Sequence, residues 1–264
     1  MNVLVPNYLT AFVLSGTAAA VAAIFLGVNR VLKRAAWPDR DRKRAFGSIG
    51  TLLAAWLLAA LVPSLLEFYR GTASGIPTIQ FGLLIPIVAG ILLFQWWATL
   101  RRVIEATPQE WIVGVQFYRA LGVIFLILWA AGRMPGAFAL PAGIGDVLVG
   151  LLAPVVGIAY ARSPRKSAGW LRVWNLFGIG DLVVAVTTGF LTSPSQFQIV
   201  AFDDPNKLIS AFPLVMIPVF LVPLSILLHL ASLWKLRRAE TTVGGQVRAG
   251  LGMTEAETTS PKFN

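Results

Sequence analysis

Residues 111–131 read WIVGVQFYRALGVIFLILWAA, an apolar run with one charged side chain, Arg119. A helix rises about 1.5 Å per residue, so a run of this length can cross a hydrocarbon core about 30 Å thick. The run is continuous rather than alternating, and lipid tolerates only helices and closed barrels. Residues 111–131 therefore predict a membrane-spanning helix.

Six further runs share this pattern, and together they decide the fold class. They occupy residues 8–29, 45–66, 77–100, 138–160, 170–191 and 212–234. We therefore expect an all-α membrane protein with seven transmembrane helices, forming a single domain over residues 1–236. Residues 237–264 contain few large apolar side chains, and we expect them to form a disordered cytoplasmic tail.

The composition supports this class and excludes several others. Of 264 residues, 56% are hydrophobic and 13% are charged, whereas a soluble domain has about 25% charged residues. The absence of cysteine excludes disulfides, thiolate metal sites and a cysteine nucleophile. A single histidine excludes a bis-histidine haem site within one chain. No cofactor, no metal and no nucleic-acid partner are expected.

The placement of basic residues predicts the orientation. Of 22 Lys and Arg residues, 18 lie in the first, third and fifth connections and the tail, counting Arg172 at a span edge with the fifth connection. Only three lie in the other connections, and cytoplasmic segments carry such an excess. We expect the N-terminus outside, the C-terminus in the cytoplasm, and the chain in the plasma membrane (cell inner membrane in a bacterium). The basic run 30–44 is interpreted as a topology determinant, with an anionic-lipid patch as the alternative.

Four ionisable residues lie inside the spans and mark the candidate site. A charge at the bilayer centre costs about 2.5–3.5 kcal/mol on insertion scales, so it normally faces a partner or a cavity. Counted from the span ends, Arg119, Asp146 and Asp181 lie within one or two helical turns of one another along the membrane normal. His229 lies five residues from Trp234 and is expected in a shallower layer.

Helical spacing adds two polar side chains to this set. Gln116 shares a face with Arg119, and Asn175 shares a stripe with Asp181. Glycines beside both aspartates would let neighbouring helices approach closely. The predicted substrate- or ion-binding residues are Arg119, Asp146, Asp181, Gln116, Asn175 and His229. The alternative is that the charged residues only clamp helices together.

A short internal repeat contains both aspartates. Residues 143–150 read GIGDVLVG, and residues 178–185 read GIGDLVVA. Consecutive spans run in opposite directions, so the two copies are antiparallel. Inverted repeats in transporters place ion and substrate sites near the bilayer midplane, and this pair follows the same logic on a small scale.

The repeated GxGD string also resembles the motif of intramembrane aspartyl proteases of the presenilin and prepilin-peptidase type. That resemblance implies a hydrolase in which Asp146 and Asp181 share a proton, one activating water and the other polarising the substrate carbonyl. The chain has neither the Tyr-Asp nor the Pro-Ala-Leu sequence found in presenilin-type members.

Transport is the function that these features favour. We expect a transporter or permease for a small solute, coupled to ions or protons, with Arg119 as counter-charge to Asp146 and Asp181. The alternatives are an intramembrane aspartyl-type hydrolase and a non-catalytic heptahelical receptor or assembly subunit. The sequence does not determine the oligomeric state, and a homo-oligomer is one possibility. Pro213, Pro218 and Pro223 predict a bend in the last span, whereas the fourth and sixth spans are expected to be straight.

Overall fold

The computed structural model describes residues 6–35, 37–71 and 75–258. These residues form helices and connections, with no strand among them. Seven helical segments within the described chain are long and apolar enough to cross a membrane, which confirms the predicted all-helical class. The spans are α1 (Asn7–Arg34), α2 (Asp39–Leu65), α3 (Ile79–Trp96), the fourth span built from α5 (Gln109–Gly114), η1 (Val115–Gly122) and α6 (Val123–Ala130), then α7 (Gly136–Arg162), α8 (Pro164–Thr192), and the seventh span of η2 (Ile217–Leu221) and α9 (Val222–Thr258).

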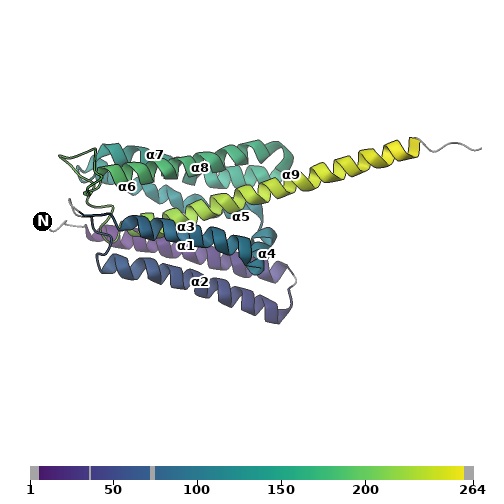
Figure 1. Ribbon diagram of the computed structural model, residues 1–264, viewed down its shortest axis with the longest axis horizontal. Coiled ribbons are helices and arrows are strands. Elements are labelled where there is room, and N and C mark those ends of the chain that lie inside the picture. The colour runs from purple at the N-terminus through teal and green to yellow at the C-terminus, as the bar shows by residue number, and fades with distance from the viewer. Residues whose placement is uncertain (1–5, 36, 72–74, 259–264) are drawn as a thin grey trace, which may run out of the picture.

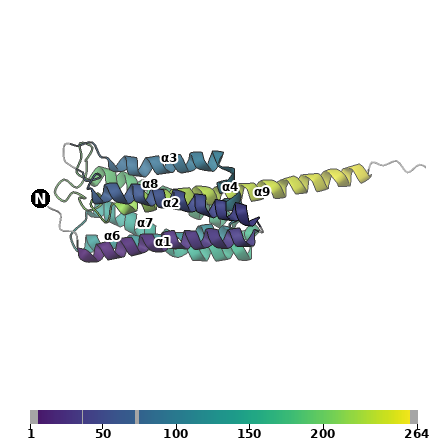
Figure 2. The ribbon, with the colours of Figure 1, turned by 90° about the horizontal axis from the view of Figure 1, so that it is seen from below.

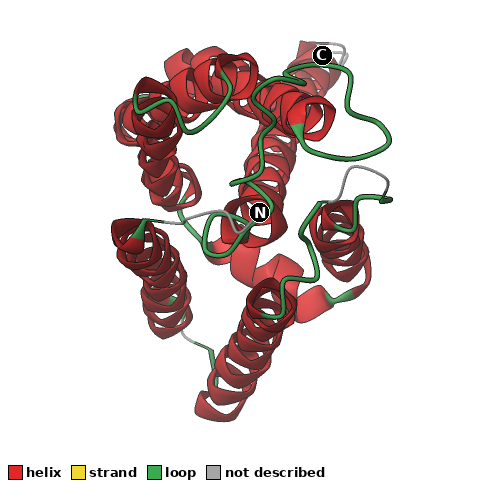
Figure 3. Cartoon of the chain, turned by 90° about the vertical axis from the view of Figure 1, so that its left-hand side faces the viewer, coloured by secondary structure: helices red, strands yellow, loops and turns green. Residues whose placement is uncertain are grey.

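The spans lie side by side in an elongated bundle (Figures 1 and 2). The longer connections, including residues 193–216, gather at the end that holds the N-terminus (Figure 1). Figure 3 shows the spans end-on from that side. The short helix α4 (Ala98–Ala106) lies at the opposite end, where α9 projects beyond the bundle. The two termini therefore lie at opposite ends, as an odd number of spans requires.

The fourth span differs from the straight α-helix that the sequence predicted. Its middle third, η1, is a 3₁₀ segment that follows Gly114 and ends at Gly122. Glycine is a poor α-helix former, which weakens the regular pattern at both ends of this segment. Side chains three residues apart eclipse one another in a 3₁₀ helix. Gln116, Arg119 and Gly122 consequently share one face, and all three are buried.

Glycines set the close packing of α7 against η1 and α8. A methyl group added at Gly150 would meet the backbone nitrogen of Ala120 and lie 2.9 Å from the carbonyl carbon of Arg119. The backbone of η1 therefore rests directly on α7. Such contacts between small residues allow helices to approach closely in membranes, and this one fixes the position of Arg119 relative to α7.

The seventh span begins later and continues further than predicted. Residues 208–216 form turns, and the helix starts at Ile217 with a π segment that contains Pro218, which cannot donate a backbone hydrogen bond. Residues 237–258, which belong to the predicted disordered tail, are described as part of α9, which runs to Thr258. Good helix formers follow Trp234, and Glu240 pairs with Arg172 of α8 at 2.5 Å. Residues 259–264 of that predicted tail lie outside the described residues.

Two glycine-to-alanine variants test this packing. We expect Gly150→Ala to lower the Tm in detergent, because overpacking against a fixed backbone costs about 1–3 kcal/mol. Gly180→Ala is the matched control, since a methyl group there would meet no atom within 4 Å. The control should keep or raise the Tm because alanine favours the helix. Equal Tm values for the two variants would contradict the close contact between α7 and η1.

Candidate functional site

Arg119 is the centre of a buried polar cluster that joins four spans. Its Nε donates to Oδ1 of Asp146 on α7 at 2.8 Å, and its Nη2 forms an ion pair with the same oxygen at 2.8 Å and donates to Oδ2 of Asp181 on α8. Its Nη1 donates to the carbonyl of Gly178 at 3.2 Å and contacts Nε2 of His229 at 3.1 Å. A guanidinium has five N–H donors. Each of the three guanidinium nitrogens of Arg119 thus has an acceptor inside the protein.

The glycines of the internal repeat provide the space for this cluster. A methyl group at Gly145 would overlap the carboxylate of Asp181, and one at Gly178 would overlap the ring of His229. Gly122 of η1 faces Asp146 in the same way. The side chains of Arg119, Asp146 and Asp181 are 2%, 11% and 6% exposed, so the ion pairs are almost completely shielded. The repeat therefore contributes both the aspartates and the glycines that allow the cluster to pack closely.

The predicted shallow position of His229 is wrong. Its side chain is fully buried and contacts Arg119 directly. The prediction took Trp234 as the end of the span, but α9 continues beyond it. Because a guanidinium only donates, Nε2 of His229 must accept, and Nδ1–H donates to Oδ1 of Asn175 at 3.0 Å. We assign a neutral histidine with its proton on Nδ1 from this network.

Asn175 extends the network away from the aspartates. Its Nδ2 donates to Oγ of Ser232 at 2.9 Å, and Nε2 of Gln109 donates to the same oxygen at 2.7 Å. The connected side chains run from Asp146 and Asp181 through Arg119, His229, Asn175 and Ser232 to Gln109. Gln109 and Ser232 were not predicted. Ser232 lies three residues after His229, and this spacing could have placed it on the same face.

Gln116 is the predicted residue that the structure does not bring into the network. It is fully buried on the same face as Arg119. Neither its Oε1 nor its Nε2 has a hydrogen-bond partner among the described residues. Leaving a buried polar group unpaired costs about 1–3 kcal/mol. Gln116 is therefore an unsatisfied amide beside the cluster rather than a member of it.

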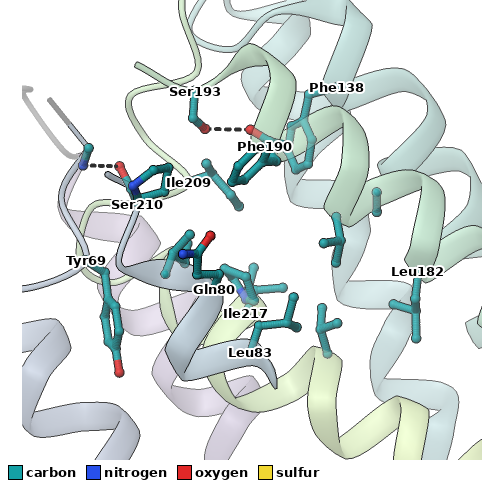
Figure 4. A pocket seen from close by; sticks show the side chains of 18 of the residues that line it. Tyr69, Gln80, Leu83, Phe138, Leu182, Phe190, Ser193, Ile209, Ser210 and Ile217 are labelled. Carbon is teal, nitrogen blue, oxygen red and sulfur yellow. Dashed lines mark hydrogen bonds between the residues drawn. The ribbon is translucent and has the colours of Figure 1, made fainter. Parts of the chain in front are cut away.

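A cavity of about 90 Å³ (Figure 4) lies between connections at the end that holds the N-terminus and the cluster, since Asp146 is part of its lining. The end lined by the connections, with Gly71, Ser193 and Ser210, is called the mouth here, and the inner end contains Leu182 and Asp146. From Ser193 to Leu182 the wall follows α8 for about 16 Å. Most of the lining side chains are apolar. Asp146 is thus the contact between the cavity and the buried charges.

The arrangement can accept one more positive charge. Two carboxylates face one guanidinium and a neutral histidine, so a proton or a monovalent cation would balance the second carboxylate. A multivalent metal is a poorer match, because the described residues hold no group of three or more His, Cys, Asp or Glu side chains able to bind one. The donor set therefore favours protons or monovalent cations over metal chemistry.

Removing members of the cluster should separate charge burial from helix packing. Arg119→Leu should lower the free energy of unfolding by about 3–5 kcal/mol, because it leaves buried carboxylates without a partner. The triple variant Arg119→Leu, Asp146→Leu, Asp181→Leu removes all three charges and should recover most of this loss. Thermal unfolding in one detergent would compare the three proteins. A triple variant as unstable as the single one would contradict this electrostatic account.

The comparisons with known proteins place the chain in a family but assign it no activity. No curated protein matches the sequence, and no solved structure matches it. A family model described as domain of unknown function DUF8737 matches residues 76–237. This match runs from just before α3 into α9 and contains every residue of the polar cluster, whereas α1 and α2 precede it. Because it covers more than half of the chain, the protein belongs to the DUF8737 family.

Proposed function

We propose that the protein is a transporter for a small solute, coupled to protons or monovalent cations, with Asp146 and Asp181 as the coupling carboxylates. The observation that carries this proposal is that a cavity lined by the connections at one end of the bundle also has Asp146 of the buried cluster in its lining. Ionisable residues within spans usually line ion or substrate paths. Arg119 would hold the two carboxylates and provide their counter-charge.

The contacts on the opposite side of the cluster support an outward-open, inward-closed state. Gln109, Ser232 and Asn175 form a continuous hydrogen-bonded layer between the fourth, sixth and seventh spans. Beyond it, Nζ of Lys235 donates to the carbonyls of Ile104, Glu105 and Thr107 at 2.6–2.9 Å. These contacts tie α9 to the end of α4. Alternating access would require them to separate while the cavity closes.

Transport fits this geometry better than hydrolysis does. An aspartyl hydrolase needs two carboxyl groups that share a proton and activate water. Here Arg119 forms an ion pair with each aspartate, so each carboxylate is turned toward the guanidinium. A purely structural clamp is the main alternative, because each guanidinium nitrogen has an acceptor inside the protein. The cavity at Asp146 is the feature that a clamp does not need.

We further propose that the chain lies in the plasma membrane, in contact with its lipids, with the N-terminus outside and the C-terminus in the cytoplasm. The excess of Lys and Arg in the connections at the α4 end supports this orientation. In this orientation the cavity opens to the exterior. Solute would enter from outside and leave past the layer formed by Gln109 and Ser232.

Flux measurements test the role of the carboxylates. In proteoliposomes with an imposed pH or sodium gradient, Asp146→Asn and Asp181→Asn should each reduce proton or sodium flux by about tenfold or more, because an amide keeps the shape but cannot titrate. Asp203→Asn makes the same chemical change in an exposed connection and should leave flux unchanged. Flux that persists in both cluster variants would leave the clamp as the better explanation.

Reporter fusions test the orientation. A reporter active only in the cytoplasm should be active when fused after Asn264 and inactive when fused before Met1, because the basic connections are retained inside. A second reporter, active only outside, should give the reverse pattern. Activity of the cytoplasmic reporter at the N-terminus would contradict the proposed direction and place the mouth of the cavity on the inner side.

A further inference from the structure

We infer that the cavity binds a small organic cation, an apolar molecule with one protonated amine that contacts Asp146. The inference deepens the proposed function by naming a substrate class. It rests on that proposal for the transport step only, since binding follows from the cavity itself.

The walls of the cavity match a hydrocarbon body. Leu83, Leu182 and Ile217 line it from α3, α8 and η2 (Figure 4). Phe138 of α7 and Phe125 of α6 add two aromatic rings, packed edge to face with centroids 5.2 Å apart. Such walls cannot replace the water shell of a divalent ion, which needs about six oxygen ligands. They can bury alkyl or aryl groups favourably.

The polar groups of the cavity lie at its two ends. Tyr69, Gln80, Ser193 and Ser210 are near the mouth, where the connections meet the spans. Asp146 is the charged side chain of the lining and lies about 12 Å further along α7 than Phe138, counted by helical rise. A ligand that enters fully would therefore meet apolar walls along its length and a carboxylate at its inner tip.

Asp146 keeps one oxygen available for such a ligand. Its Oδ1 accepts a hydrogen bond from Nε of Arg119 and forms an ion pair with Nη2. No described residue donates a hydrogen bond to Oδ2, although only 7% of the surface of Asp146 is exposed. An ammonium group is a compact donor that can bind this oxygen. It would also supply the positive charge that balances the second carboxylate of the cluster.

The size of the cavity limits the ligand. A space of about 90 Å³ is small beside the pockets of about 300–1,000 Å³ that hold drug-sized molecules. A short alkylamine therefore fits better than a large amphiphile. A neutral alcohol of the same length would leave Oδ2 facing an uncharged group, and a carboxylic acid anion would be repelled by Asp146. The geometry thus predicts an order of binding of amine, then alcohol, then acid anion.

Calorimetric titration of the purified full-length protein with n-butylammonium, butan-1-ol, butyrate and sodium chloride tests the inference. We expect butylammonium to bind wild type, with an affinity about tenfold or more above that of butan-1-ol. Asp146→Asn should weaken butylammonium binding by about tenfold, whereas Asp203→Asn should not change it. Equal affinity for amine and alcohol, or no effect of Asp146→Asn, would overturn the assignment.

A second pair of variants tests the cavity without altering the cluster. Ala185→Leu would fill space in the wall of the cavity, and Val184→Leu makes a similar addition on the exposed side of α8. We expect loss of butylammonium binding in the first variant and wild-type affinity in the second. Equal affinity in both, or no binding to wild type, would refute the site.

Flux assays separate this inference from the proposed function. Saturable butylammonium binding without uptake into proteoliposomes would support the binding site and contradict transport. Proton or sodium flux that depends on Asp146, without butylammonium binding, would support transport and refute this substrate class.

Discussion

The guanidinium of Arg119 links the fourth, fifth, sixth and seventh spans through Asp146, Asp181, the Gly178 carbonyl and His229. A buried arginine is stable only when its charge and all its donors are satisfied, so the four elements must lie in one arrangement around it. This arrangement depends on three features: the 3₁₀ segment, the close contact at Gly150, and the glycines opposite Asp181 and His229. The same arrangement leaves Asp146 in the lining of a cavity.

The bundle as a set of spans could be predicted because length and hydropathy suffice to identify a helix that crosses lipid. The charged members of the cluster could also be predicted, since lipid makes each of them costly. The depth of His229 could not, because depth was counted from a tryptophan that does not end its helix. Three further features depend on packing between distant segments, which periodicity within one span does not report. They are the 3₁₀ segment, the layer with Gln109 and Ser232, and the cavity.

The glycines in the two copies of the GxGD repeat make different contacts. Only the aspartates have equivalent roles in the cluster, since each forms an ion pair with Arg119. Gly145 makes room for Asp181, whereas a methyl group at the equivalent Gly180 would meet no atom within 4 Å. The second copy uses Gly178 instead, opposite His229 and Arg119. Asp146 lines the cavity, and Asp181 does not. The two carboxylates are therefore not interchangeable, although both form an ion pair with Arg119.

The central claim is that water and solute reach Asp146 from the N-terminal end. Measuring solvent access along α8 tests this claim most directly. The chain has no native cysteine, so single cysteines can be introduced without background. Val186 lines the cavity, and Val183 lies nearby with 57% of its surface exposed on the outside of the bundle. A charged, membrane-impermeant thiol reagent added from the N-terminal side should label Val186→Cys and spare Val183→Cys in lipid. Labelling of Val183→Cys with protection of Val186→Cys would contradict the account.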